Sequence, residues 1–472
     1  MKTTMRLLPT LTVALALGAC SVGPDYVRPA AETASGFKEA QGWKLAQPRD
    51  HLPRGQWWTL FGDPGLNELE EQVEVSSQTL RVAEAQFRQA RALAQAARAG
   101  FFPTLTGAVS TSRAGTGANN GIANSGHTFS LDANWEADIW GRIGRTVESG
   151  EASLQASAAD LQAARLSIQA TLAQNYFLLR AADEQKTLLE RTVADYQKSL
   201  QIVRNQYAAG TATRADIAQA ETQLKATQAQ AIDIGIQRAQ LEHAIALLVG
   251  KPPALFALAP GTLNANLPEI PLAMPSDLLE RRPDIAAAER RAAAANAQIG
   301  VAQAAYFPAL TLNATAGFQS ASLANWLSAP SRFWSLGPTL AASLFDGGLR
   351  QARSAQALAA YDQSVATYRQ TVLGGLQETE DNLVALRLLA DEAQVQDEAV
   401  RAARESVRLT TNQYQAGTVG YLNVVNVQVI AYNNERTALT ILGRRLTAAV
   451  LLIKALGGGW ARLDDFPVPA NS

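Results

Sequence analysis

The 472-residue chain has almost no cysteine and little histidine. A single Cys20 excludes a disulfide framework and a thiolate metal site, and three scattered histidines do not make an imidazole cluster. No apolar run reaches the 18 residues of a conventional transmembrane helix. The net charge is −1 at pH 7, which provides no basic field for nucleic acid. We therefore expect no metal, no cofactor and no nucleic-acid partner.

Catalytic signatures are missing as well. The sequence contains no G-x-S-x-G elbow and no Walker loop, and the glycines of 115–121 miss the dinucleotide-binding spacing. Acidic residues are present, but no pattern places them in a pocket. We therefore expect that the protein is not an enzyme.

The N-terminus explains the lone cysteine. Basic residues in 1–6 precede an apolar run over 7–17, and the segment closes with Leu-Gly-Ala-Cys at 17–20. This pattern predicts a signal peptide over 1–19. The closing residues resemble the bacterial lipoprotein signal, in which the cysteine is acylated and tethers the mature chain to a membrane. The alternative is an ordinary signal peptide in which Cys20 is incidental. By the same resemblance, Ser21 after the cysteine favours the outer membrane.

One large unit is duplicated. The sequence NQYAAGT at 205–211 returns as NQYQAGT at 412–418, and FPTLT at 102–106 returns as FPALT at 307–311. Shifts of 207 and 205 residues are far longer than the period of a solenoid. Six prolines in 251–275 indicate a linker between the halves. The predicted division is signal peptide 1–19, acylated N-terminal extension 20–68, first repeat 69–250, linker 251–275, second repeat 276–457 and C-terminal tail 458–472.

Each half contains very long helices. The proline-free stretch 143–208 is rich in helix formers, and its apolar residues recur in alternating steps of four and three: Leu189, Val193, Tyr196, Leu200, Val203 and Tyr207. A second helix, 213–249, follows Gly210, so the doubled motif is the turn of a helical hairpin. Helices over 69–99 and 213–249, placed end to end, match the long helix, which would span about 100 Å at 1.5 Å per residue. These lengths predict a long, narrow helical cylinder.

Strands separate the helices. Within 127–138, Phe129, Leu131, Ala133 and Trp135 fall on one face, and Ser130, Asp132, Asn134 and Glu136 fall on the other. Segments 310–318 and 334–344 repeat the alternation. A soluble, half-buried sheet would show the same alternation of apolar and polar residues, but the secretion signal and the polar loop 114–126 favour a membrane barrel. Two strands per half give four per chain, too few to close a barrel, so the chain must oligomerise.

An ordered set of motifs resembles TolC-type outer membrane factors of the lipoprotein (NodT-like) branch. The motifs are VGPDY at 22–26, WW at 57–58, PSDLLERRPDI at 275–285, FDGG at 345–348 and LGGGW at 456–460. The resemblance implies an α+β membrane protein, a homotrimer whose twelve-strand barrel takes four strands from each chain and continues into an α-helical coiled-coil tunnel. It implies a passive outer membrane duct that carries small toxic compounds from an inner-membrane pump and a periplasmic adaptor. A type I polypeptide secretion duct is the alternative. A passive coiled-coil anchor or adhesin would leave the strands unexplained.

The resemblance also implies roles for the hairpin tips, Tyr207–Asp216 and Tyr414–Asn426. They would close the periplasmic end and meet the adaptor, with Gly210, Thr211, Gly417 and Thr418 as adaptor contacts and Asp216, Tyr414, Asn423 and Asn426 as gate residues. Asp216 either links to Tyr414 or a neighbouring backbone, or serves as a first-turn helix acid beside Thr213. Asn423 and Asn426 stand where relatives commonly carry aspartates, so an acidic constriction is not expected. Arg238 and Arg445 lie on the apolar seam, where we expect structural roles.

Overall fold

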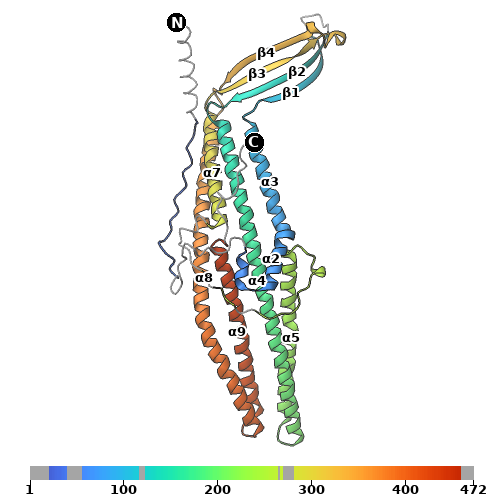
Figure 1. The fold of residues 1–472 in the computed structure, drawn as a ribbon, viewed down its shortest axis with the longest axis vertical. Coiled ribbons are helices and arrows are strands. Elements are labelled where there is room, and N and C mark those ends of the chain that lie inside the picture. Colours follow the sequence, from blue (N-terminus) through green and yellow to red (C-terminus); the bar gives the residue numbers. More distant parts are fainter. Residues whose placement is uncertain are drawn as a thin grey trace. The chain divides into compact units, whose positions relative to one another are not determined.

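The computed structural model describes residues 21–39, 56–115, 123–263, 266–268, 270 and 281–458. Cys20, the predicted signal peptide and part of the predicted linker lie outside these residues. Figure 1 shows the helices and strands of the chain. The chain forms two units. We call residues 1–31, 85–158 and 286–370 the sheet unit, and residues 32–84, 159–285 and 371–472 the hairpin unit.

Three pairs of described helices with equal lengths confirm the duplication. Helices α3 (Gln78–Ala99) and α7 (Pro283–Ala304) have 22 residues each. The long helices α4 (Arg142–Ala208) and α8 (Leu349–Gln415) have 67, and α5 (Arg214–Leu248) and α9 (Tyr421–Ala455) have 35. The long helix predicted over 143–208 is therefore confirmed to within one residue. Among the described residues, no helix has an apolar stretch of the length and hydropathy that a membrane crossing requires.

The single helix predicted over 69–99 is wrong, because the chain breaks it at Ser77. Helix α2 (Pro64–Ser76) begins after Asp63, whose carboxylate accepts hydrogen bonds from two backbone amides of the first turn. It ends where the Ser76 hydroxyl donates to the carbonyl of Val249 at 2.6 Å, and Ser77 has extended backbone angles. A contact with a residue 173 positions away thus accompanies the break.

Ahead of α2, the short 3-10 helix η1 (Trp57–Phe61) packs into the core of the hairpin unit. Trp57 and Phe61 are almost completely buried, and the ring of Phe61 lies 4.9 Å from that of Phe177 on α4. Aromatic burial therefore holds this N-terminal element against the long helix.

The four described strands form one antiparallel sheet in the order β1 (Thr104–Gly115), β2 (Ala123–Ala137), β3 (Ala309–Ser320) and β4 (Arg332–Ala341). Two short 3-10 helices, η5 (Leu323–Asn325) and η6 (Ala329–Ser331), connect β3 to β4. Strand β4 ends three residues before the predicted limit at 344. Among the described strands, β1 and β4 each pair with one neighbour only, so each has a free edge within the described part of the chain.

The sheet has two chemically different faces, as the alternation predicts. Phe129 lies opposite Val109 and Phe318, and directly opposite residues of antiparallel strands share a face. This apolar face is largely uncovered in the single chain: Val109 is 68% exposed and Trp334 is 78% exposed. On the other face, Asp132 lies opposite Thr106 and Thr315.

The described part of the predicted linker is held firmly against the helices of the hairpin unit. It contains the short 3-10 helix η3 (Pro253–Leu255). The Leu258 amide donates to Glu242, its carbonyl accepts from Arg238 at 2.5 Å, and the Ala259 carbonyl accepts from Arg180 at 2.7 Å. This segment is therefore an ordered strap and not a loose tether.

Candidate functional site at the hairpin tips

The two hairpin turns have the same backbone structure. Gly210 and Gly417 both have φ of 77°, a left-handed conformation that glycine adopts without a steric cost. Thr211 donates its amide to the carbonyl of Gln206, and Thr418 repeats this bond to Gln413. Together with the hydrogen bond that each glycine amide donates to its own helix, this threonine bond forms the Schellman motif that ends a helix. The doubled NQY-x-AGT sequence is thus a helix stop, and Gly210, Thr211, Gly417 and Thr418 are all exposed.

Asp216 caps the helix that follows the first turn. Its Oδ2 accepts from the Thr213 amide at 2.8 Å and from the Thr213 hydroxyl at 2.7 Å, and the Thr213 hydroxyl accepts from the Asp216 amide. This is a reciprocal capping box. Asp216 thus binds the neighbouring backbone amide and the side chain of Thr213, and the described hydrogen bonds include none between Asp216 and Tyr414.

The second turn has no such cap. Gly420 takes the place of Thr213, and no side chain caps the start of α9. Asn423 occupies the position that corresponds to Asp216, at a shift of 207 residues. Asn423 and Asn426 are both exposed, whereas Val424 and Val425 between them are buried. The two amides therefore lie on the open side of α9, available to a neighbouring molecule.

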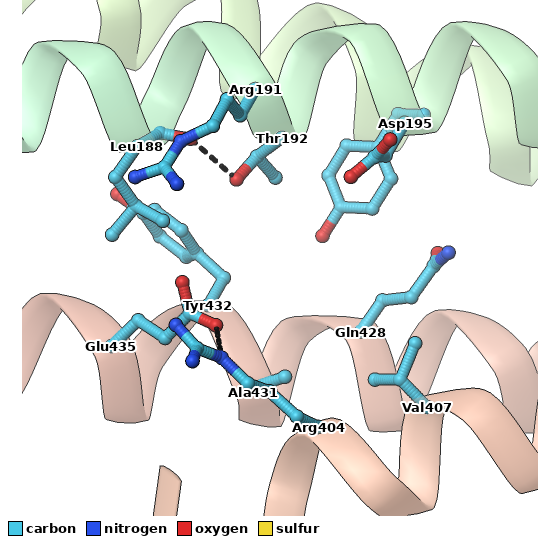
Figure 2. Close-up of a pocket in the computed structure, with 11 residues that line it drawn as sticks. Leu188, Arg191, Thr192, Asp195, Arg404, Val407, Gln428, Ala431, Tyr432 and Glu435 are labelled. Carbon is cyan, nitrogen blue, oxygen red and sulfur yellow. Dashed lines mark hydrogen bonds and ion pairs between the residues drawn. The ribbon is translucent and has the colours of Figure 1, made fainter. Parts of the chain in front are cut away.

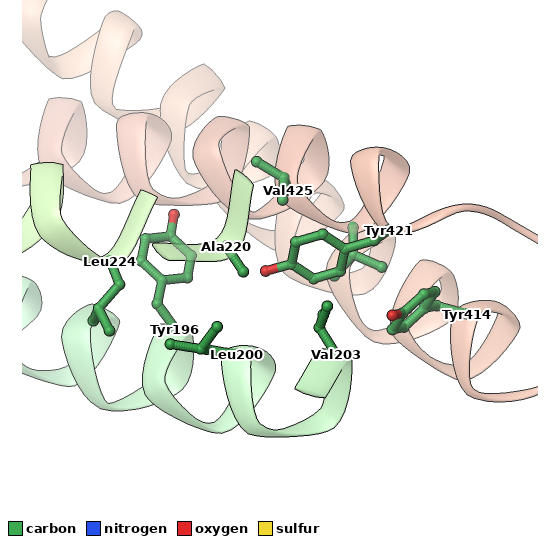
Figure 3. Packing of buried hydrophobic residues seen from close by; sticks show 9 residues of the cluster. Tyr196, Leu200, Val203, Ala220, Leu224, Tyr414, Tyr421 and Val425 are labelled. Carbon is green, nitrogen blue, oxygen red and sulfur yellow. The ribbon is translucent and has the colours of Figure 1, made fainter. Parts of the chain in front are cut away.

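An aromatic cluster joins the two hairpins just behind the turns. Tyr196 and Val203 of α4, Leu224 of α5, Tyr414 of α8 and Tyr421 of α9 belong to it. Figure 3 shows Tyr421 over Val203, with Tyr196 on one side and Tyr414 on the other. The rings of Tyr414 and Tyr421 lie 5.5 Å apart. The cluster takes side chains from all four helices of the tips and therefore couples their positions.

The tyrosine hydroxyls of this cluster are in an apolar environment. Burial, and next the electrostatic interaction with the neighbouring Tyr414 hydroxyl, raises the pKa of Tyr421 to about 12. Burial also raises the pKa of Tyr414, and the charge of Asp216 adds to this. The Tyr414 hydroxyl is buried and has no hydrogen-bond partner in the structure described. Tyr414 thus contributes packing to the tip and carries an unsatisfied polar group.

Farther from the turns, the hairpins separate around a cavity of about 440 Å³ (Figure 2). Tyr196 and Asp195 of α4 face Gln428 and Tyr432 of α9 across it. Arg404 of α8 pairs with Glu435 of α9 at 2.5 Å. The lining of this cavity is mixed and polar, in contrast to the apolar cluster behind the turns.

Sequence reasoning missed most of an ionic network that supports the hairpins. Arg238 donates to Asp183 at 2.7 Å and to Glu242 at 3.0 Å, and Asp183 also pairs with Arg180. The side chain of Asp183 is only 4% exposed. The expected structural role of Arg238 fits these contacts, because its guanidinium donates to two carboxylates and to a backbone carbonyl.

A second missed feature is Glu70 on α2. The residue is fully buried, and neither carboxylate oxygen has a hydrogen-bond partner in the described structure. Burial, and next the charge of Glu74, raises the pKa of Glu70 well above its ordinary value. The sequence marks Glu70 only as one of several acids on an amphipathic helix, so nothing in the pattern identifies it.

Comparison with known proteins agrees with this architecture. The family model described as "Outer membrane efflux protein" matches residues 69–251 and 274–458. The chain belongs to this outer membrane efflux protein family. Residues 69–251 and 274–458 carry the two hairpins and the four strands, so the match covers both repeats.

Relatives align over nearly the whole chain. The pyoverdine export outer membrane protein OpmQ of Pseudomonas aeruginosa is 32% identical over 97% of each chain. Outer membrane protein OprJ of the same species is 31% identical over 95% of each chain. The solved outer-membrane channel OprN is 31% identical, with a TM-score of 0.88 over 93% of this chain and 100% of that one.

The outer membrane efflux protein described here has the fold of trimeric outer membrane channels, with a helical tunnel and barrel strands. It is an outer membrane channel of a tripartite efflux system and acts as a passive duct, with its helical tunnel in the periplasm. Members of this family are channels.

Proposed function

We propose that three copies of this chain close one duct by pairing β1 of each copy with β4 of the next. The observation that carries this proposal is the sheet with two free edges and an uncovered apolar face. In a bilayer every backbone amide and carbonyl needs a protein partner, so a sheet survives there only when its edges are closed. Four strands from each of three copies give twelve, within the range of membrane barrels. The polar face would then line the lumen.

The hairpin tips form the periplasmic entrance in this proposal. Tyr414 holds α8 and α9 against α4 through the aromatic cluster, and Asp216 fixes the start of α5. The exposed amides of Asn423 and Asn426 would meet those of other copies at the narrow end. Amides can donate and accept hydrogen bonds around such a ring but carry no charge. The exposed Gly210, Thr211, Gly417 and Thr418 are the proposed contacts for a periplasmic adaptor.

A lipid anchor at Cys20 fits the path of the segment that follows. Ser21 lies against Gly141, between β2 and α4, and Asp25 pairs with the buried Arg145 at 2.7 Å. The Tyr26 hydroxyl donates to Glu289 at 2.6 Å. These contacts hold the residue next to Cys20 at the junction of the sheet and the helices. Acyl chains that start there would enter the membrane beside the barrel.

The proposed cargo is small molecules or ions, delivered by an inner-membrane pump through the adaptor. The names of relatives include pyoverdine export, toluene efflux and cation efflux. Such variety supports a duct whose cargo is selected by the pump and which performs no chemistry itself.

We also propose that the chain is divided as its sequence predicts, with segments that end at residues 19, 68, 250, 275 and 457. Equal helix lengths in the two halves and the family match over 69–251 and 274–458 support it.

A deletion strain that lacks other family channels tests the efflux role. Accumulation of a fluorescent pump substrate should rise on deletion and return to its original level when the full chain is expressed. Addition of a proton uncoupler to both strains should remove the difference, because a passive duct depends on an energised pump. Equal accumulation in energised cells with and without the chain would contradict the proposal.

A further inference from the structure

The polar face of the sheet carries very little charge. Residue pairing places two charged side chains on this face of the described strands, Asp132 and Glu136, both from β2. Arg142 neutralises Glu136 through two hydrogen bonds, of 2.8 Å and 2.7 Å. Asp132 is therefore the one unneutralised charge on the polar face of the described strands.

Hydroxyl groups, and not cations, surround the Asp132 carboxylate. Thr315 of β3 donates to Oδ1 at 2.7 Å, and Ser130 donates to Oδ2 at 2.7 Å. Thr106 lies directly opposite on β1, and Ser335 of β4 continues the row beyond Thr315. The described contacts include no ion pair for Asp132. Its negative charge is thus held in place on an otherwise neutral row that crosses the whole sheet.

We propose that Asp132 sets the ion preference of the barrel segment. The inference rests on the proposed assembly, in which three polar faces line one lumen and three Asp132 carboxylates lie at one level. Rings of carboxylates on a pore wall attract cations and repel anions, and low-dielectric walls focus the field. The barrel lumen would therefore favour cationic over anionic solutes at this level, independently of the uncharged amides proposed at the periplasmic tip.

A local probe separates this effect from that of the tip. A Thr106→Cys reporter lies beside Asp132, and its reaction rate can be measured with a trimethylammonium and a sulfonate methanethiosulfonate reagent on the full chain in vesicles. The chain with no added cysteine gives the background from Cys20. A Val109→Cys reporter on the apolar face tests the assembly: these water-soluble reagents should label residue 106 and leave residue 109 unlabelled. The reverse result would contradict the proposed barrel itself.

The ratio of cationic to anionic rates then tests Asp132. Asp132→Asn keeps the size of the side chain and one oxygen that can accept a hydrogen bond from a hydroxyl. This variant should lower the ratio of cationic to anionic rates by about threefold or more. Asp132→Glu should preserve it, and adding Asn134→Asp to Asp132→Asn should restore it by returning a charge to the same face. If residue 106 is labelled but the ratio is the same in all variants, the inference is wrong while the barrel stands. Asp132→Ser supplies a second neutral variant if Asp132→Asn does not assemble.

Discussion

Asp183 and Arg238 are joined by a 2.7 Å contact between Oδ1 and Nε, and this pair fixes the strap that connects the two repeats. Arg238 also donates to the Leu258 carbonyl, and the second carboxylate oxygen of Asp183 accepts from the Gly261 amide at 3.1 Å. Arg238 of α5 thus binds both α4 and the strap, and Asp183 of α4 binds both α5 and the strap. The strap is held by charged groups that were brought together by folding and not by their spacing in the sequence.

Arg238→Ala should release the strap. Asp183 is nearly buried, and removal of one partner of a buried pair costs about 3–5 kcal/mol. Arg180 still compensates Asp183, so the lower end is expected. Thermolysin should cleave within 252–263 much faster than in the unmodified protein. Arg408→Ala, which removes a mainly exposed ion pair within one helix, is the control and should leave cleavage unchanged. Equal cleavage of both variants would show that the contacts of Arg238 do not hold the strap.

Glu70 should make stability fall as pH rises. Its folded pKa lies above the unfolded value, so the folded state retains the proton more tightly. The contribution is complete below the unfolded pKa and is lost as pH rises toward the folded pKa, by at most about 1.4 kcal/mol per pH unit. Thermal unfolding of Glu70→Gln should show a smaller decrease in midpoint between pH 5 and 8, with Glu71→Gln, at an ordinary position, as the control. Parallel curves for all three proteins would contradict a neutral, buried Glu70.

The hydroxyl and the ring of Tyr414 should have different effects. Tyr414→Phe removes an unsatisfied buried hydroxyl and should be neutral or slightly stabilising. Tyr414→Ala removes the ring from the aromatic cluster and should cost about 3–5 kcal/mol. In planar bilayers the alanine variant should open more often, because the contact between the hairpins behind the turns is weakened. An unchanged open probability in both variants would place the closing contact outside the cluster.

Cations should block the channel only weakly, because the amides at the second tip carry no charge. Conductance is expected to respond weakly to pH between 5 and 7 and to divalent or trivalent cations. Replacing Asn423 and Asn426 by aspartate should increase the block, because crowded carboxylates attract cations. Asn433→Asp adds a charge on an exposed part of α9 beyond the tip and serves as the control. Micromolar block of the unmodified channel, insensitive to residues 423 and 426, would place the gate elsewhere.

The elements that could be predicted from the sequence are those determined by residues close together in the chain. The heptad steps from Leu189 to Tyr207 predicted α4, and strict alternation from Phe129 to Trp135 predicted the faces of β2. The repeated NQY-x-AGT turn could be located because its glycine and threonine form the helix stop themselves.

The missed features depend on contacts between distant parts of the chain. The break at Ser77 follows a hydrogen bond from Ser76 to Val249, and the strap depends on Asp183, 55 residues before Arg238. The burial of Glu70 likewise results from packing, because its helix carries several similar acids. Neither periodicity nor composition encodes such pairings.

Closure of the sheet between chains is the central claim, and native mass spectrometry in mild detergent tests it most directly. The free edges of β1 and β4 should be paired with other copies, so the membrane-extracted protein should appear as a trimer. A Tyr414→Phe sample, with unaltered strands, should give the same trimeric state. A membrane-inserted monomer, stable at the dilutions used, would contradict the account, since one chain leaves both edges of its sheet open.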